Sequence, residues 1–270
     1  MAPMSMSPRR KLAIASWSSP TEGNIYGKLT VEATQALAYI EQVKERTGEK
    51  ITITHLIGRA CAEALKEAPS LNGVIRFGAF VPHKTVDITY LVTLEGGNNL
   101  AKVKVCDADK KSVVQTAVEL REYAERLRAG KDDAFKMSQG PLALLPTWLI
   151  RPLVAFTGWL TAVMGVNMPL FGLEAYPFGS LIITSVGMFG LDEGFAPPTP
   201  FAHVPIYVLL GAVRDMPVAV DGVVVVRKMV TLCATIDHRF IDGAQGGILA
   251  KTIRRVLENP WELDPKQIAG

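Results

Sequence analysis

Two short apolar runs constrain the fold of this chain more than any other feature. Residues 180–186 read SLIITSV and residues 205–213 read PIYVLLGAV, and neither run contains a charged side chain. Runs of this length, rich in β-branched residues, are typical of strands that are buried on both faces. The sequence therefore predicts a central sheet that other elements must cover.

Amphipathic segments supply helices for that cover. Apolar residues recur at helical spacing over residues 31–46, 54–68, 112–129 and 244–258. We expect the first helix to end at Thr47-Gly48, because a glycine commonly follows the last helical turn.

Further strands complete the pattern. Residues 85–94 and 228–236 alternate or concentrate apolar side chains, and Asp221-Gly222 separates the valine-rich segments 218–220 and 223–226. An Asp-Gly pair between such segments is a strong signal for a hairpin. Because helices and strands alternate without a linker, the predicted fold class is α/β, a mixed sheet with flanking helices in one domain.

Composition narrows the classes of function. The 270 residues carry a net charge of only +3, which is too small to indicate a surface that binds nucleic acid. The three cysteines are widely spaced and odd in number, so we expect reduced thiols and neither a disulfide framework nor a metal site. The apolar segment after Arg9-Arg10 is too short for an export signal, and we expect a cytoplasmic protein.

One apolar segment needs a separate explanation. No charged residue occurs from Pro152 to Leu173, a length that would suit a membrane span. Pro152, Asn167 and Pro169 argue against a regular span, so we favour a buried or oligomer-facing helix. Peripheral contact with a membrane through residues 152–173 is the alternative.

The segment from Asp237 to Gly243, DHRFIDG, carries the clearest chemistry. A strand that ends at His238 delivers an imidazole from the buried edge of a sheet, and histidine can take up and return a proton near neutral pH. Asp242, four residues later, can fix the tautomer of the ring or brace the loop, and we expect Gly243 to permit a sharp turn. Motifs for serine hydrolases, phosphate-binding loops and zinc proteases are missing from the sequence.

Four segments together resemble a known family. Residues 231–260, TLCATIDHRFIDGAQGGILAKTIRRVLENP, closely resemble the C-terminal signature of the dihydrolipoamide acyltransferases, the catalytic cores of 2-oxo acid dehydrogenase complexes. Residues 51–75, 106–131 and 179–213 are similar to further segments of that family, in the same order. The resemblance implies the fold that these enzymes share with chloramphenicol acetyltransferase, a two-layer sandwich.

The resemblance also implies a mechanism. Acyl coenzyme A would be a substrate, and His238 would act as general base on a thiol or hydroxyl acceptor, without a metal. Thr184, in the segment ITSVG, would donate a hydrogen bond to the tetrahedral oxyanion, with Ser185 as the alternative donor. Asp242 would brace the loop, and Ser185 and Gly243 would line the substrate site.

Partners follow from the same resemblance. A homotrimer is implied, with His238 and Thr184 meeting between subunits, whereas further assembly into cages is left open. We expect a catalytic domain over residues 9–270, a disordered tail over residues 1–8, and an apolar insert at about 141–177. Because we find neither a lipoyl nor a subunit-binding domain, and hence no bound lipoyl group, the acceptor would be a separate lipoyl-bearing protein or a small molecule.

Two departures leave another function open. Residues 98–105 differ from the family pattern, and the insert has no counterpart in it. A trimeric scaffold that has kept the acyltransferase fold without catalysis, with the insert as its partner or membrane contact, is the alternative hypothesis. An acetyltransferase that modifies drugs is a third and weaker candidate.

Overall fold

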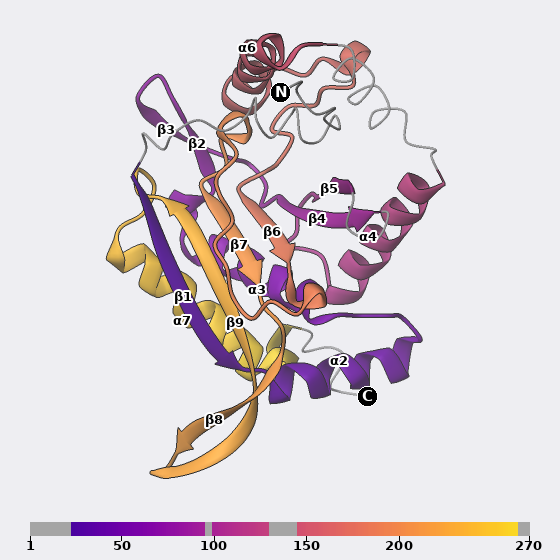
Figure 1. Ribbon diagram of the computed structural model, residues 1–270, viewed down its shortest axis with the longest axis vertical. Helices are drawn as coiled ribbons and strands as arrows, with labels where there is room; N and C mark the ends of the chain where they lie inside the picture. Colours follow the sequence, from indigo (N-terminus) through magenta and orange to yellow (C-terminus); the bar gives the residue numbers. More distant parts are fainter. Residues whose placement is uncertain (1–22, 95–98, 130–144, 264–270) are drawn as a thin grey trace, which may run out of the picture.

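A seven-stranded mixed sheet forms the centre of the protein (Figure 1). The computed structural model describes residues 23–94, 99–129 and 145–263. The strands follow one another across the sheet in the order β1 (Asn24–Glu32), β9 (Val223–Asp237), β7 (Ile206–Leu210), β6 (Leu181–Ser185), β4 (Ile88–Leu94) and β5 (Asn99–Val105). β6 runs parallel to β4 and β7, whereas β9 is antiparallel to β1 and β7. The predicted mixed sheet is therefore confirmed.

Helices cover one face of this sheet and bury most of the core. They are α2 (Thr34–Thr47), α3 (Ile53–Glu67), α4 (Val113–Arg128) and α7 (Gly243–Glu258). α3 and α7 lie behind the sheet in Figure 1, and α3 packs against α7 along its length. The main core cluster combines residues of these helices with alternate residues of the strands, such as Leu181, Ile183 and Val208. The flanking helices thus match the prediction.

Short turns of 3-10 helix connect several of these elements. They span Pro69–Leu71, Pro169–Phe171, Gly187–Phe189, Pro200–Ala202 and Pro260–Leu263. A separate two-stranded sheet, β2 (Gly73–Arg76) and β3 (Ala79–Pro82), lies beside the main sheet.

The ends of the predicted helices agree with their capping residues. Gly48 follows α2 with a φ of 72°, a left-handed conformation that suits glycine. Ser112 caps α4 and Asp242 caps α7, each with a glutamine three residues later that completes a capping box. These local signals place the helix ends within one or two residues of the prediction.

The start of the chain corrects one prediction. Residues 31 and 32 belong to strand β1 and not to the first helix, which begins at Thr34. The segment before it alternates Ile25, Leu29 and Val31 with polar side chains, a period of two that favours a strand. β2, β3 and β5 were also not predicted.

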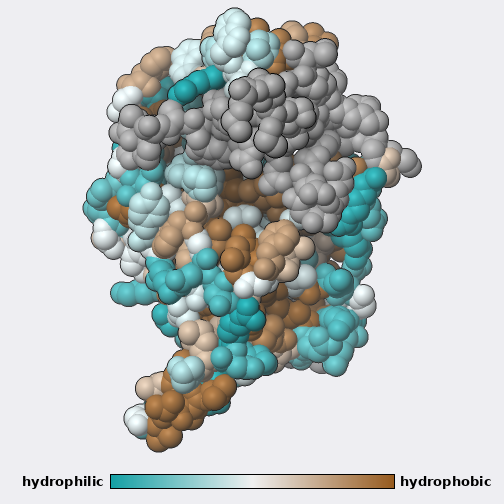
Figure 2. All heavy atoms as spheres, in the orientation of Figure 1, coloured by the Kyte–Doolittle hydropathy of each residue, from teal (hydrophilic) through white to brown (hydrophobic). Residues whose placement is uncertain are grey.

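The Asp221-Gly222 hairpin is confirmed. Both residues have positive φ, 49° and 79°, and they join β9 to β8 (Arg214–Val220). β9 has 15 residues, so its first half pairs with β8 and projects from the body of the molecule. Figure 2 shows apolar side chains over this projection, where Val224 is 72% exposed.

The apolar insert folds as a short helical unit. α6 (Thr147–Gly158) continues into a π-helical turn, Trp159–Val163. Arg76 of β2 holds this unit, because its Nε donates to the carbonyl oxygen of Val163 and its Nη2 donates to the hydroxyl of Tyr176, each at 2.8 Å. Among the described residues, no helix combines the length and apolarity needed to cross a membrane.

The insert exposes several large apolar side chains. Ile150 of α6 is fully buried, yet Trp148 is 75% exposed, and Leu170 and Phe171 in the following 3-10 turn are 88% and 70% exposed. Within one chain the insert is therefore only partly buried, and an oligomer-facing position stays a prediction. The predicted tail 1–8, residues 141–144 of the predicted insert and residues 264–270 lie outside the described residues.

Candidate active site

His238 lies at the point where the long strand β9 leaves the sheet. The backbone N–H of Asp237 donates to the carbonyl oxygen of Pro205 at 2.9 Å, and that of His238 donates to the carbonyl oxygen of Gly23 at 3.0 Å. These bonds hold the backbone on both sides, while the side chain of His238 is exposed to solvent. The sheet thus fixes where the imidazole begins and leaves its ring accessible.

The orientation of the imidazole ring is set by the backbone of its own loop. Nδ1 of His238 lies 2.5 Å from the carbonyl oxygen of Ile241. Because a carbonyl oxygen can only accept, Nδ1 must carry the proton, and the neutral ring then has its lone pair on Nε2. An imidazole in this tautomer, with Nε2 as the free basic nitrogen, can remove a proton from a bound acceptor.

An ion pair stiffens the loop that contains His238. The guanidinium of Arg239 contacts both carboxylate oxygens of Asp237, with its Nη2 at 2.6 Å from Oδ2 and its Nε at 3.0 Å from each oxygen. The backbone N–H of Arg239 also donates to Oδ1 of Asp237 at 2.9 Å. The two residues that flank His238 are therefore joined across it, which restricts the motion of the imidazole.

Asp242 ends the loop by capping α7. Its Oδ1 accepts from the backbone N–H of Ala244 at 2.9 Å, and Oε1 of Gln245 accepts from the backbone N–H of Asp242 at 3.1 Å. The carboxylate thus binds the helix, while the carbonyl oxygen of Ile241 fixes the ring tautomer. Gly243 starts α7 without a positive φ, and a Cβ there would meet nothing within 4 Å. The expectation was that Gly243 permits a sharp turn, and the structure gives this turn no need for the conformational freedom of glycine.

Thr184 and Ser185 form the carboxyl end of β6, and both are half-buried. Ile183 belongs to the core under the helices and Ile182 belongs to a second cluster on the opposite face. Since side chains alternate along a strand, Thr184 points to the face away from α3 and α7.

The chain after β6 is tied down closely. The backbone N–H of Val186 donates to the carbonyl oxygen of Leu210 at 2.9 Å. Gly211 allows the backbone of Asp192 to pass close by, because a Cβ at position 211 would lie 1.7 Å from the carbonyl oxygen of Asp192. The end of β6 therefore has a fixed place in the fold.

Within one chain, the structure does not bring His238 and Thr184 together. Thr184 pairs with Leu209 of β7, and Leu209 pairs with Cys233 of β9, five residues before His238. At about 3.3 Å per residue and 4.8 Å per strand, the two backbone positions are about 19 Å apart. A single hydroxyl and imidazole at that distance cannot act on one carbonyl group.

Other candidate groups have structural roles or suggest no site. Nδ1 of His55 accepts from the backbone N–H of Thr52 at 3.2 Å and closes the capping box of α3, and burial lowers its pKa to about 4. The ring of His83 packs edge-on against Tyr176 at 4.6 Å. Among the residues that the structure describes, no group of three or more His, Cys, Asp or Glu side chains is arranged to hold a metal ion.

Sequence reasoning missed the carbonyl oxygen of Ile241 and the pairing of Asp237 with Arg239. A backbone carbonyl has no signature in a sequence. Asp237 and Arg239 lie on either side of His238 and carry opposite charges, and this could have indicated an ion pair between them.

Comparison with known proteins identifies the fold and the family. The chain is 27% identical over 227 residues to a mitochondrial dihydrolipoyllysine-residue succinyltransferase of Saccharomyces cerevisiae, covering 83% of this chain and 39% of that protein. It superimposes on a dihydrolipoamide acetyltransferase of Azotobacter vinelandii with a TM-score of 0.68 at 20% identity, covering 97% of this chain and 93% of the other. A chloramphenicol acetyltransferase has a TM-score of 0.51 at 13% identity, with 94% and 96% covered, which confirms the predicted fold.

The match to the family itself covers most of the sequence. The family described as 2-oxoacid dehydrogenases acyltransferase (catalytic domain) matches this chain over residues 9–144 and 174–264. The gap in the match, residues 145–173, contains α6 and the turns after it, within the predicted insert. The chain belongs to the family of 2-oxoacid dehydrogenase acyltransferase catalytic domains.

Proposed function

We propose that this chain transfers an acyl group between coenzyme A and a thiol or hydroxyl acceptor, with a dihydrolipoyl group as the favoured acceptor. The observation that carries the proposal is the hydrogen bond from Nδ1 of His238 to the carbonyl oxygen of Ile241, which leaves Nε2 as an exposed base. Membership of a family whose relatives act on dihydrolipoyl residues supports the choice of acceptor.

The reaction proceeds by direct attack. Nε2 of His238 takes the proton of the acceptor thiol as its sulfur attacks the thioester carbonyl of acyl coenzyme A. The tetrahedral intermediate then collapses, the carbon–sulfur bond to coenzyme A breaks, and the departing thiolate receives the proton from the imidazolium. The histidine ends neutral, so each cycle balances without an acyl-enzyme or a metal.

Thr184 donates a hydrogen bond to the oxyanion of that intermediate, and Ser185 is the alternative donor. Support comes from the Azotobacter enzyme, for which a serine, a histidine and an asparagine were studied as parts of the catalytic mechanism. Its histidine and asparagine are four positions apart, as are His238 and Asp242 here. Asp242 braces the loop through the cap of α7, and Gly243 leaves room for substrate beside it.

A second copy of the chain supplies the missing half of the site. The separation of about 19 Å between His238 and Thr184 within one chain supports this proposal, because the two residues could then act on one carbonyl group only across an interface. We propose a homotrimer, in line with the family resemblance. The projecting β8–β9 hairpin offers an apolar surface that a neighbouring subunit can cover, since Val223, Val224 and Val226 are each more than 60% exposed.

The acceptor would be presented by another protein. This chain spans 39% of the length of the yeast relative and 44% of the length of a Bacillus subtilis relative. A separate lipoyl-bearing protein is the favoured partner, and a cytoplasmic location stays a prediction.

The test is release of the coenzyme A thiol from acetyl-, propionyl- and longer acyl coenzyme A with dihydrolipoamide as acceptor. The proposal expects turnover by the wild type, and loss of turnover in His238→Ala with the oligomer and melting temperature unchanged. Lys251→Ala is a control, because Lys251 is exposed on α7 and forms no part of the proposed site. Turnover that survives in His238→Ala would rule out this histidine as the base.

A second candidate function rests on the insert. Residues 145–173 lie outside the family match and expose Trp148, Leu170 and Phe171, which suits a scaffold that contacts a partner or, less favourably, a membrane. A scaffold without catalysis would show no turnover, and no acyl coenzyme A would raise its melting temperature.

A further inference from the structure

A partly open pocket of about 230 Å³ lies between the sheet and the first half of α7. Its walls come from six elements, the strands β1, β6, β7 and β9 and the helices α3 and α7. They include Gly27 of β1, Ile206 of β7, Ile236 of β9, Cys61 of α3, and Gly246 and Ala250 of α7. A concave pocket with mostly apolar walls is the usual form of a binding site for an apolar ligand.

Small residues facing one another create the cavity. Gly27 alternates with Ile25 and Leu29 on the face of β1 turned toward α7, and a Cβ added to Gly27 would meet nothing within 4 Å. A Cβ added to Gly246 would meet only the Cδ1 of Ile241, at 3.7 Å. Because β1 is the edge strand and Gly27 is exposed, the cavity has its mouth at this edge of the sheet.

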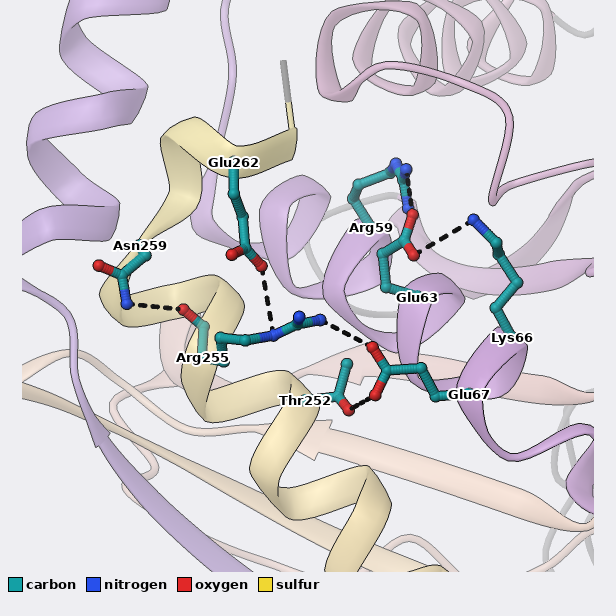
Figure 3. Close-up of polar contacts among 8 residues, drawn as sticks. All are labelled: Arg59, Glu63, Lys66, Glu67, Thr252, Arg255, Asn259 and Glu262. Atoms are coloured by element: carbon teal, nitrogen blue, oxygen red, sulfur yellow. Dashed lines mark hydrogen bonds and ion pairs between the residues drawn. The ribbon is translucent and has the colours of Figure 1, made fainter. Parts of the chain in front are cut away.

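The helix above the cavity is held at both ends, so it cannot move down to fill the space. Asp242 caps its first turn. Toward its other end, Arg255 and Thr252 both bind the carboxylate of Glu67 on α3, at 2.8 and 2.5 Å (Figure 3). The side chains between these two anchors therefore stay at a fixed distance from the sheet.

The chemistry of the walls selects an apolar occupant. Lys28 contributes to the lining, but its ammonium is paired with Glu193 at the surface. Burial raises the pKa of the Cys61 thiol to about 12, so this group stays uncharged. The other polar side chain of the lining, that of Tyr26, is 62% exposed and its ring packs edge-on against Phe195. The walls are therefore mostly apolar and give an ordered water few of the two to four polar partners that it needs.

We propose that the cavity beneath α7 is a binding site for an unbranched hydrocarbon chain, entered beside Gly27. One end of the cavity is formed by Ile236 and by its partners on the two neighbouring strands, Ile25 and Ile206. Ile236 directly precedes Asp237 in the sequence. That end is therefore next to the loop of His238. The chain has two sources, the acyl tail of a coenzyme A thioester bound at His238 or a free fatty acid bound independently of the reaction.

Calorimetric titration of the full chain with octanoate tests the site directly. The wild type is expected to bind octanoate and to melt at a higher temperature in its presence. Ala250→Leu places a side chain inside the cavity and should weaken binding about tenfold, the factor expected when about two methylene groups lose their buried place. Lys251→Leu adds the same side chain on the exposed side of the same turn and should bind octanoate as the wild type does.

Gly27→Val narrows the cavity from the opposite wall, so the test does not depend on one variant folding. Octanoate binding that is absent in the wild type, or unchanged in both Ala250→Leu and Gly27→Val, would overturn the proposal. Comparison of turnover with octanoyl and acetyl coenzyme A separates the sources. A loss confined to octanoyl transfer in Ala250→Leu identifies the acyl tail, and octanoate binding without any such effect identifies a free acid. Binding in a protein that transfers no acyl group would leave this site standing and refute the proposed catalysis alone.

Discussion

Mixing two inactive variants gives the sharpest test of a site shared between subunits. His238→Ala removes the proposed base, and Thr184→Ala removes the proposed oxyanion donor. Within one chain the two positions are about 19 Å apart, so under this proposal each complete site takes His238 from one subunit and Thr184 from its neighbour. A mixed oligomer can then contain a site in which both residues are intact, although every chain carries one of the two substitutions.

The size of the recovery follows from counting. When the two variants are produced in equal amounts and assemble at random, about one site in four pairs an intact His238 with an intact Thr184. The unfractionated mixture should therefore show about a quarter of the wild-type turnover, and isolated trimers that contain both chains about a third, because each of them has one complete site among three. Thr184→Ala alone should retain about 1% or less, since loss of one oxyanion donor commonly costs a factor of a hundred or more.

The assay needs two affinity tags, one on each variant, so that oligomers containing both chains can be isolated after co-expression. Release of coenzyme A thiol is then measured against each parent. Mixed oligomers that are no more active than the average of the parents would refute the shared site, or the role of Thr184. Repeating the mixture with Ser185→Ala in place of Thr184→Ala decides between those two explanations, because Ser185 is the alternative donor.

Two further predictions concern stability and the insert. Burial lowers the pKa of His55 from 6.5 in the unfolded chain to about 4 in the folded chain. Between these two pH values the unfolded chain binds a proton at His55 and the folded chain does not. The free energy of unfolding should therefore fall by about 3 kcal/mol as the pH falls from 6.5 to 4. His55→Gln keeps a capping side chain, and urea unfolding should show a flatter pH profile; an unchanged slope contradicts this. Replacing Leu170 and Phe171 by serine should leave the melting temperature nearly unchanged, because both are exposed, and should reduce association measured by sedimentation. A large drop in melting temperature would mean that both side chains are packed.

Local signals accounted for much of the fold. Gly48 and Asp242 mark helix ends through backbone conformation and a single side-chain bond, and Asp221-Gly222 makes a turn with two positive φ angles. Such features involve few neighbouring residues, so they can be read from a sequence. β1 and β5 were harder, because β1 is interrupted by Gly27 and β5 alternates small apolar residues with Lys102 and Lys104.

The site could be predicted only in part, for a physical reason. DHRFIDG indicated His238 because the motif is continuous in the sequence. The bond that orients the ring comes from a backbone carbonyl, which every residue possesses, so no side chain identifies it. The distance between His238 and Thr184 depends on the register of three strands, which only the folded sheet reveals.

The composition of the β8–β9 hairpin has a consequence for the life of the newly made chain. Residues 218–226 read VAVDGVVVV, with one charge among six valines, and they stand clear of the body as an edge that can pair with any other extended strand. Such segments add to one another and start aggregates when they remain uncovered. If a neighbouring subunit covers the hairpin, as proposed, chains face their greatest risk of aggregation between folding and assembly.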